Sequence, residues 1–104
     1  DMNKFYVPQY QTGNSSFSFP IITRYGDIEP LKEMLKENKI EYRPIISGNL
    51  LRHPAFSKYE LCTKKAASNV EILHKKGLYV GNSQFVTKKQ IDLLFNILEE
   101  YVKL

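Results

Sequence analysis

The sequence predicts an α/β (α+β) two-layer sandwich, in which a small three-stranded sheet has helices packed on one face. The chain has 104 residues, which suits one domain with a modest core. Segments whose apolar residues alternate, as in strands, are interspersed with segments whose apolar residues recur at helical spacing. Their order is strand, helix, strand, loop, short helix, strand and helix, which favours one sheet covered by helices.

Residues 1–15 show little apolar periodicity and contain Pro8, Gly13 and Asn14, so we expect a linker or extended arm there. The folded domain is then expected to comprise residues 16–104.

The first strand is expected in residues 16–21, where phenylalanine and isoleucine alternate with serine and proline. Because Pro20 has no N–H for a sheet ladder, this strand should lie at an edge or be interrupted there. A helix over 28–38 follows, with Asp27 suited to its N-cap and Asn38 to the left-handed conformation that ends it. The apolar stripe of this helix consists of Ile28, Leu31, Met34 and Leu35.

The second strand is expected over Ile40–Ile46, ahead of an irregular loop at 47–65. Loops of this length in a compact domain are more often functional than structural filler. Ser68 and Glu71 have the spacing of a capping box, which predicts the start of a short helix that Gly77 closes.

The third strand is expected at Leu78–Val80 and ends at Gly81 and Asn82. Thr87 and Gln90 form a second capping box, and the helix that they begin runs to the C-terminus. One face of this last helix is apolar and consists of Ile91, Leu94, Phe95, Leu98 and Val102.

The formal net charge is +4, from 15 lysines and arginines against 11 aspartates and glutamates. A basic balance can indicate a nucleic-acid partner. In residues 29–39, however, lysines alternate with glutamates, which is typical of a solvated helix face. We therefore expect no nucleic-acid partner.

No apolar run approaches the roughly 18 residues that a membrane span requires. Residues 1–10 lack the basic start and apolar core of a signal peptide. The single cysteine, Cys62, excludes an internal disulfide framework. These features predict a cytoplasmic protein without a membrane partner.

The sequence lacks the residue patterns of common enzyme sites, including the P-loop and the dinucleotide-binding glycines. Cys62, His53 and His74 do not have the spacing of a metal site. A nucleophile pair of Cys62 and His53 would lack a third group to orient it. His74 lies near a predicted helix end, where a cation interacts favourably with the helix dipole. We therefore expect no catalytic, cofactor-binding or metal-ligating residue in this chain.

The segment that stands out is a loop containing Gly48, Asn49, Arg52 and His53, which follows the second strand. Asn49 offers a donor and an acceptor, and Arg52 offers a planar fork suited to phosphate or carboxylate. Gly48 would let the backbone approach a ligand closely. These residue types fit either a loop for an anionic or sugar ligand or a surface turn with a solvated arginine.

This loop, RPIISGNLLRHPAF, resembles the pattern R-P-x-x-x-G-N-L-L-R-Q-P-A-F/Y of sugar-modifying members of the DegT/DnrJ/EryC1/StrS family. The segments VPQYQTGNSSFSFPI, LKEMLKENKIEYRP and NVEILHKKGLYVGNSQFVTKKQIDLL are similar to the family's flanking segments, in the same order. The resemblance covers nearly the whole chain.

The resemblance implies the C-terminal small domain of a fold-type I aminotransferase. The complete enzyme would use pyridoxal phosphate (PLP) to modify nucleotide-linked 4-keto-6-deoxy sugars, as an aminotransferase or a 3-dehydratase in surface polysaccharide (lipopolysaccharide) or related sugar biosynthesis. A missing N-terminal large domain would hold PLP and supply the Schiff-base lysine, or the histidine that replaces it. The complete enzyme would be a homodimer, and this fragment would be inactive and would bind no cofactor.

Carried over by position, Gly48, Asn49, Arg52 and His53 are the substrate-binding residues that the resemblance implies. Asn49 and Arg52 would face the sugar nucleotide or the domain interface. His53 stands where relatives often have glutamine.

A second glycine–asparagine turn, Gly81 and Asn82, also matches the family and is expected near the same cleft. Three positions depart from the family pattern. Ser16 and Ser18 replace a tryptophan and a glycine, and Lys39 replaces the glycine after the first helix.

The alternative is a stand-alone basic α/β binding module for RNA or a protein partner. Such a module should gather positive charge and exposed aromatic residues on its sheet. A severed domain should instead expose an apolar patch where its neighbour sat. The candidates for that patch are Phe5, Tyr6, Phe17 and Phe85.

Overall fold

The computed structural model describes residues 2–9, 11–46, 48–56 and 64–104. Its strands are β1 (Phe5–Tyr6), β2 (Ser18–Thr23), β3 (Tyr42–Arg43) and β4 (Gly77–Gly81), and its helices are α1 (Glu29–Glu37), α2 (Lys64–Lys76) and α3 (Lys88–Val102). Short 3-10 turns lie at Met2–Lys4, Leu50–Arg52 and Pro54–Phe56. Cys62 lies outside the described residues.

The four strands form one antiparallel sheet in the order β1-β2-β4-β3. The predicted fold class is confirmed, but the sheet has a fourth strand. This strand, β1, lies within the segment 1–15 that was expected to be an arm. A two-residue strand carries too little alternation to be recognised from its own sequence.

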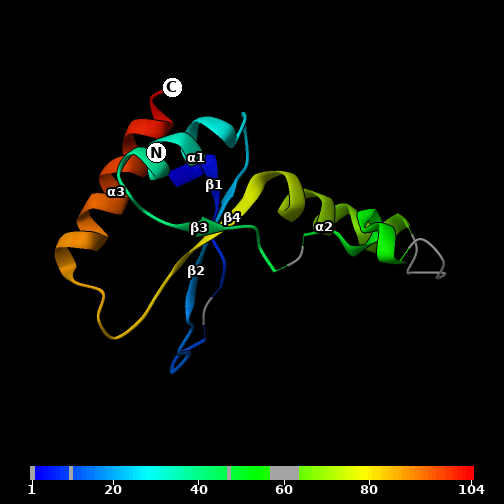
Figure 1. Cartoon of the computed structure of the whole chain (residues 1–104), viewed down its shortest axis with the longest axis horizontal. Helices are drawn as coiled ribbons and strands as arrows, with labels where there is room; N and C mark the ends of the chain where they lie inside the picture. Colours follow the sequence, from blue (N-terminus) through cyan, green and yellow to red (C-terminus); the bar gives the residue numbers. More distant parts are fainter. Residues whose placement is uncertain (1, 10, 47, 57–63) are drawn as a thin grey trace.

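Helices α1 and α3 pack together at one face of the sheet, whereas α2 extends away from them (Figure 1). The final turns of α2 lie near the opposite sheet face, where Ile72 and Leu73 share a small hollow with Tyr6 and Ile22. The prediction that helices cover one face therefore holds for α1 and α3, and α2 departs from it.

The hydrophobic core lies between the sheet and the α1–α3 layer. Alternation places Ile21 and Thr23 of β2 on this face, beside Leu78 and Val80 of β4. Phe5 belongs to the same core, where its ring packs against Tyr101 at a centroid distance of 6.0 Å. The helices contribute Ile28, Leu31, Leu35, Ile97, Leu98 and Tyr101.

Strand β2 shows how a proline is accommodated within the sheet. Its backbone groups alternate between two neighbours, and the bond from Arg24 N–H to the Lys4 carbonyl shows that even-numbered residues face β1. The pairing with β1 ends at Tyr6 and Ile22. Pro20 therefore lies where β2 has no paired neighbour on that side, so its missing N–H removes no ladder bond.

Helix α1 begins and ends within one residue of the predicted range. The Asp27 carboxylate accepts a bond from Glu29 N–H at 3.1 Å, although the N-cap itself is Ile28. At the other end, Lys39 rather than Asn38 is left-handed, with φ of 59°. Bonds from Ile40 N–H to the Leu35 carbonyl and from Lys39 N–H to the Lys36 carbonyl complete a Schellman motif.

One helix prediction and one strand prediction require correction. Helix α2 begins at Lys64, so Ser68 lies inside it and does not form the predicted capping box with Glu71. The cause is the preceding Lys-Lys-Ala-Ala segment, which consists of good helix formers. The second strand is also shorter than predicted, because it ends before Pro44.

Helix α3 begins with the predicted capping box, in which Thr87 and Gln90 satisfy each other's backbone N–H groups. Its buried stripe differs from the prediction, because Ile97, Leu98 and Tyr101 are buried. The predicted members Ile91 and Phe95 remain 44% and 42% exposed. The N-terminal half of α3 thus presents apolar side chains outward.

Candidate functional site

The candidate site is the bend Gly48–Arg52, which follows β3 and begins with a left-handed glycine, φ 69°. Asn49 caps the short turn Leu50–Arg52, since its side-chain oxygen accepts a bond from Leu51 N–H at 3.0 Å. This is the Asx geometry in which asparagine stabilises a turn locally. Part of the loop that resembles the family pattern is thus stabilised by a hydrogen bond within the loop itself.

The bend is attached to α2 through Asn49. Its backbone N–H donates to Nδ1 of His74 at 2.9 Å, and its side-chain amide donates to the Glu71 carboxylate at 2.7 Å. Asn49 is only 3% exposed. Its side chain is therefore turned toward the helix, and its polar groups are satisfied within the chain.

Arg52 forms the second attachment. Its Nε and Nη2 donate to the two oxygens of Glu71 at 2.6 and 2.7 Å, which is a bidentate ion pair. The hydrogen bonds from Arg52 and then Asn49 lower the pKa of Glu71 to about 2. The same ion pair raises the pKa of Arg52. Both groups are therefore charged across the neutral range.

Gly48 fits closely against the ring of His74. A Cβ atom added to Gly48 would lie 2.3 Å from Nδ1 of His74, closer than atoms can approach. The glycine is needed here both for its left-handed φ and for this contact.

The outer side of the bend is apolar. Leu50 and Leu51 are 45% and 41% exposed, and Ile46, just before the bend, is 88% exposed. Ile46 also has a left-handed φ of 51°, which is a rare conformation for a β-branched residue. Such backbone strain tends to occur at functional sites.

The proposed substrate contacts of Gly48, Asn49, Arg52 and His53 stay a prediction. The structure places Gly48, Asn49 and Arg52 against α2. The half-buried His53 follows the turn and donates its backbone N–H to the Leu50 carbonyl. A ligand would thus meet the exposed part of Arg52 before the buried Asn49.

Sequence reasoning missed two residues that hold the bend, Glu71 and His74. Glu71 was assigned to a capping box, and His74 was interpreted as a cation at a helix end. In the structure, Nδ1 of His74 instead accepts a hydrogen bond from the Asn49 N–H. Their spacing of three residues, which places both on one helix face, was the available signal.

The second glycine–asparagine turn lies elsewhere. Strand β3 runs antiparallel to β4, and Ile45, two residues beyond the end of β3, reaches the Gly77 end of β4. The bend thus lies near the start of β4, and Gly81 and Asn82 lie at its other end. The two turns lie at opposite ends of β4, and the groove described below is lined by Gly81 and Asn82 but not by the bend, so a cleft shared by both turns stays a prediction.

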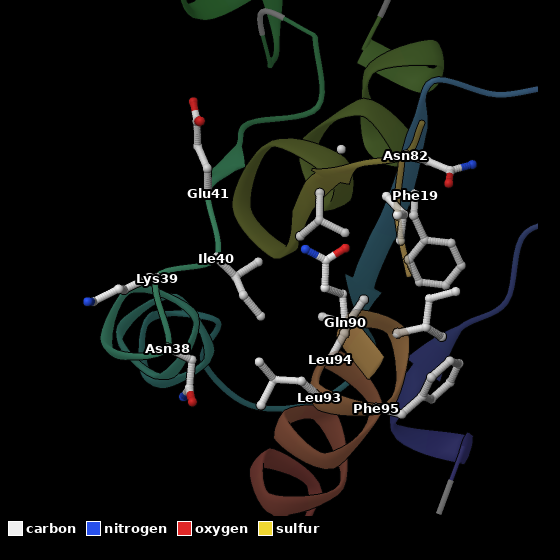
Figure 2. Close-up of a pocket in the computed structure, with 14 residues that line it drawn as sticks. Phe19, Asn38, Lys39, Ile40, Glu41, Asn82, Gln90, Leu93, Leu94 and Phe95 are labelled. Atoms are coloured by element: carbon white, nitrogen blue, oxygen red, sulfur yellow. The ribbon is translucent and has the colours of Figure 1, made fainter. Parts of the chain in front are cut away.

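Asn82 instead lines an apolar groove of about 500 Å³ between α3 and the sheet (Figure 2). Figure 2 shows Ile40 on one wall, Leu94 of α3 on another and Phe19 on the strand side, while Lys39 and Glu41 point away from the centre. The groove is partly open to solvent.

Three of the four residues predicted for an exposed patch are exposed. Phe17 and Phe85 are 78% and 80% exposed, and Tyr6 is 43% exposed. Phe5 is buried in the core, so its place in the patch was wrong. None of the described helices is long and apolar enough to cross a membrane.

No protein-family model matches the chain. It is 40% identical over 96 residues to GDP-4-keto-6-deoxy-D-mannose 3-dehydratase of Escherichia coli, and 36% identical over 97 residues to the enzyme of the same name from Yersinia pseudotuberculosis. Each alignment covers 88% of this chain but 25% of the relative, so the chain spans about a quarter of their length.

Solved structures agree with these alignments. The E. coli GDP-4-keto-6-deoxy-D-mannose-3-dehydratase with bound hydrated PLP superposes with a TM-score of 0.83 and 31% identity, over 94% of this chain and 26% of that one. A GDP-4-keto-6-deoxymannose-3-dehydratase with a trapped PLP-glutamate geminal diamine superposes with a TM-score of 0.76 and 35% identity. The match covers 86% of this chain and 25% of that one. The chain is therefore homologous to a quarter-length part of GDP-4-keto-6-deoxymannose 3-dehydratases, PLP-dependent enzymes like those of the DegT/DnrJ/EryC1/StrS family, as its sequence indicated.

Proposed function

We propose that this chain is the C-terminal small domain of a PLP-dependent enzyme that removes the 3-hydroxyl of a GDP-linked 4-keto-6-deoxy sugar. The observation that carries this proposal is the superposition on the E. coli dehydratase over 94% of the chain at 31% identity. Dehydration is favoured over amino transfer because the relatives from E. coli and Yersinia pseudotuberculosis are both named as 3-dehydratases.

The exposed apolar surface supports the idea of a domain that lacks its neighbour. The groove and the exposed Phe17 and Phe85 leave large apolar side chains in solvent, which isolated soluble domains rarely do over a contiguous area. We propose that the larger part of the enzyme covers this surface.

PLP supplies an electron sink when it is bound, and its site needs donors for the phosphate and a partner for the ring nitrogen. The described residues do not form such a site. The groove is lined mainly by apolar side chains, its Lys39 and Glu41 point outward, and Arg52 is paired with Glu71. We propose that PLP binds to the rest of the enzyme and that this chain contributes the bend as one rim of the substrate cleft.

Two finer proposals follow from the family resemblance. The complete enzyme is expected to be a homodimer with shared sites, and its product is expected to enter surface polysaccharides such as lipopolysaccharide. Size measurement of the complete enzyme tests the first of these.

The alternative, a stand-alone basic module for RNA or a protein partner, has less support. Several of the described basic side chains pair with carboxylates, among them Lys32 with Glu29, Arg43 with Glu41 and Lys88 with Asp92. Each of these pairs lowers the positive charge that the phosphates of an RNA would meet.

A chimeric enzyme tests the proposed function. This chain would replace the matching quarter of the E. coli dehydratase, and release of the 3-deoxy product from the GDP-linked keto sugar would be measured. We expect turnover well above that of the E. coli enzyme truncated before that quarter. A PLP-loaded, folded chimera without turnover would contradict the proposal.

The chain on its own gives a second test. Mixed with PLP and dialysed, it is expected to retain no yellow colour and no aldimine absorbance. Stable absorbance would show a cofactor site in this chain and would contradict the division of roles proposed above.

A further inference from the structure

Two side chains of α2 face the bend and make the hydrogen bonds that attach it to the helix. Glu71 and His74 are three residues apart, so they lie on the same side of the helix. Glu71 accepts from Asn49 and Arg52, and His74 accepts from the Asn49 backbone. This pair contacts the bend from behind, opposite the exposed Leu50 and Leu51.

We propose that Glu71 and His74 are positioning residues, which fix the bend in one conformation and set the direction in which Arg52 meets the diphosphate of the sugar nucleotide. The part of this proposal that concerns the sugar nucleotide rests on the proposed function. The attachment of the bend itself rests on the geometry alone.

His74 fixes the backbone of the bend. Its Nδ1 accepts the Asn49 N–H at 2.9 Å, and the Gly48 Cα lies so close that no side chain fits between. The hydrogen bond requires an unprotonated Nδ1 at that point in space. A residue with an acceptor elsewhere would leave the buried Asn49 N–H without a partner.

Glu71 fixes the plane of the Arg52 guanidinium. Both carboxylate oxygens accept from one edge of the group, through Nε and Nη2. A guanidinium has a second edge, formed by Nη1 and Nη2, which can bind a phosphate while the first edge stays on a carboxylate. The Arg52 side chain is 51% exposed, so a ligand can approach the guanidinium while its first edge stays on Glu71.

The direction in which Glu71→Gln changes KM distinguishes positioning from simple charge competition. If Glu71 merely competed with the ligand for Arg52, Glu71→Gln would free the cation and tighten binding. If Glu71 positions Arg52, the same change loosens the guanidinium, and KM for the sugar nucleotide rises. We expect a rise of about tenfold, comparable to one hydrogen bond to a charged group, with kcat little changed.

The kinetic test uses the chimera with Glu71→Gln, with Glu71→Asp as the conservative variant and Glu37→Gln as the control. Glu37 is exposed on α1, away from the bend, so its substitution should leave KM unchanged. Partial recovery with Asp and a raised KM with Gln support the proposal. An unchanged or lowered KM for Glu71→Gln would overturn it.

The His74 test uses two amides of different length. Asparagine places its oxygen near the position of Nδ1, whereas glutamine places it near Nε2. In amide NMR spectra of this chain, His74→Asn should keep the Asn49 resonance protected from solvent exchange and His74→Gln should not. Equal protection in both variants would contradict the assigned role.

The same spectra separate the two proposals. If the chimera with the native chain is inactive, the proposed function fails, and the NMR data still decide whether α2 positions the bend. In that measurement Glu71→Gln should expose the Arg52 Nε–H to rapid exchange, while resonances of α3 stay unchanged. An Arg52 Nε–H that stays protected in Glu71→Gln would contradict the inference.

Discussion

The two sides of the sheet are held together by different physical forces. On the side of α1 and α3, fully buried side chains such as Leu31, Leu35 and Leu78 form an apolar core. On the side of α2, the bend is attached by charged and neutral hydrogen bonds from Glu71 and His74. Apolar burial is strong but non-directional, whereas hydrogen bonds fix distances and angles. The first region thus supplies stability, and the second supplies geometry.

The largest effect is expected in the apolar region. Leu35→Ala removes a side chain that is 0% exposed, and it should lower the free energy of unfolding by about 2–5 kcal/mol because a cavity remains. Urea denaturation measures the change. Leu93→Ala, at a position 39% exposed beside the groove, is the control and should change stability by about 0.5 kcal/mol or less. Equal losses at both positions would show that the core is not where the structure places it.

The next effect tests how closely the bend fits α2. Gly13 and Gly48 both have left-handed φ, 83° and 69°, but nothing lies within 4 Å of a Cβ at Gly13. Alanine therefore incurs a left-handed backbone cost at both positions, and only Gly48→Ala also meets His74. We expect Gly48→Ala to destabilise by about 1–3 kcal/mol more than Gly13→Ala, the usual cost of overpacking.

A double-mutant cycle with His74→Ala tests whether the extra destabilisation by Gly48→Ala comes from contact with the His74 ring. Removing the imidazole should relieve the clash, so Gly48→Ala should cost less in the His74→Ala background. Additive losses would mean that the bend does not pack against this ring.

The Glu71 network should give the α2 side a distinctive pH dependence. The folded pKa of Glu71 is about 2, below the ordinary value of about 4.3, so the unfolded chain binds more protons between these values. The stabilisation is complete above about pH 4.3 and is lost as the pH falls toward 2. Urea midpoints of wild type and Glu71→Gln should therefore converge as the pH falls through this window. A constant difference would contradict the ion pair, and the interaction should weaken in high salt.

The apolar region was the easier one to predict from the sequence. Periodicity located α1, β4 and α3, because a continuous apolar stripe is a property of neighbouring residues. The register of α3 was partly wrong, since Ile91 and Phe95 belong to the stripe but lie beyond the end of the core. The start of α2 was missed because Ser68 and Glu71 have capping-box spacing inside a longer helix.

The polar region was only half predictable. The loop residues Gly48, Asn49 and Arg52 stood out by their chemistry and by resemblance to a family. Their partners did not, because Glu71 and His74 are 19 or more residues distant along the chain from the bend residues they bind. Contacts of that kind depend on the tertiary fold, and no local pattern encodes them.

The smallest expected change in stability is at the end of α1. There the backbone conformation explains why the resembled family has glycine. Lys39 has a φ of 59° at the position where the resembled family has glycine. A left-handed conformation costs a non-glycine residue about 1–2 kcal/mol, part of which glycine loses again through its larger unfolded-state entropy. Lys39→Gly should therefore raise the free energy of unfolding by up to about 1 kcal/mol. Lys36→Gly, three residues earlier inside the helix, should instead lower it by about 1 kcal/mol. Opposite signs from the same substitution would locate the left-handed residue at 39, and a loss at both positions would place the end of the helix beyond it.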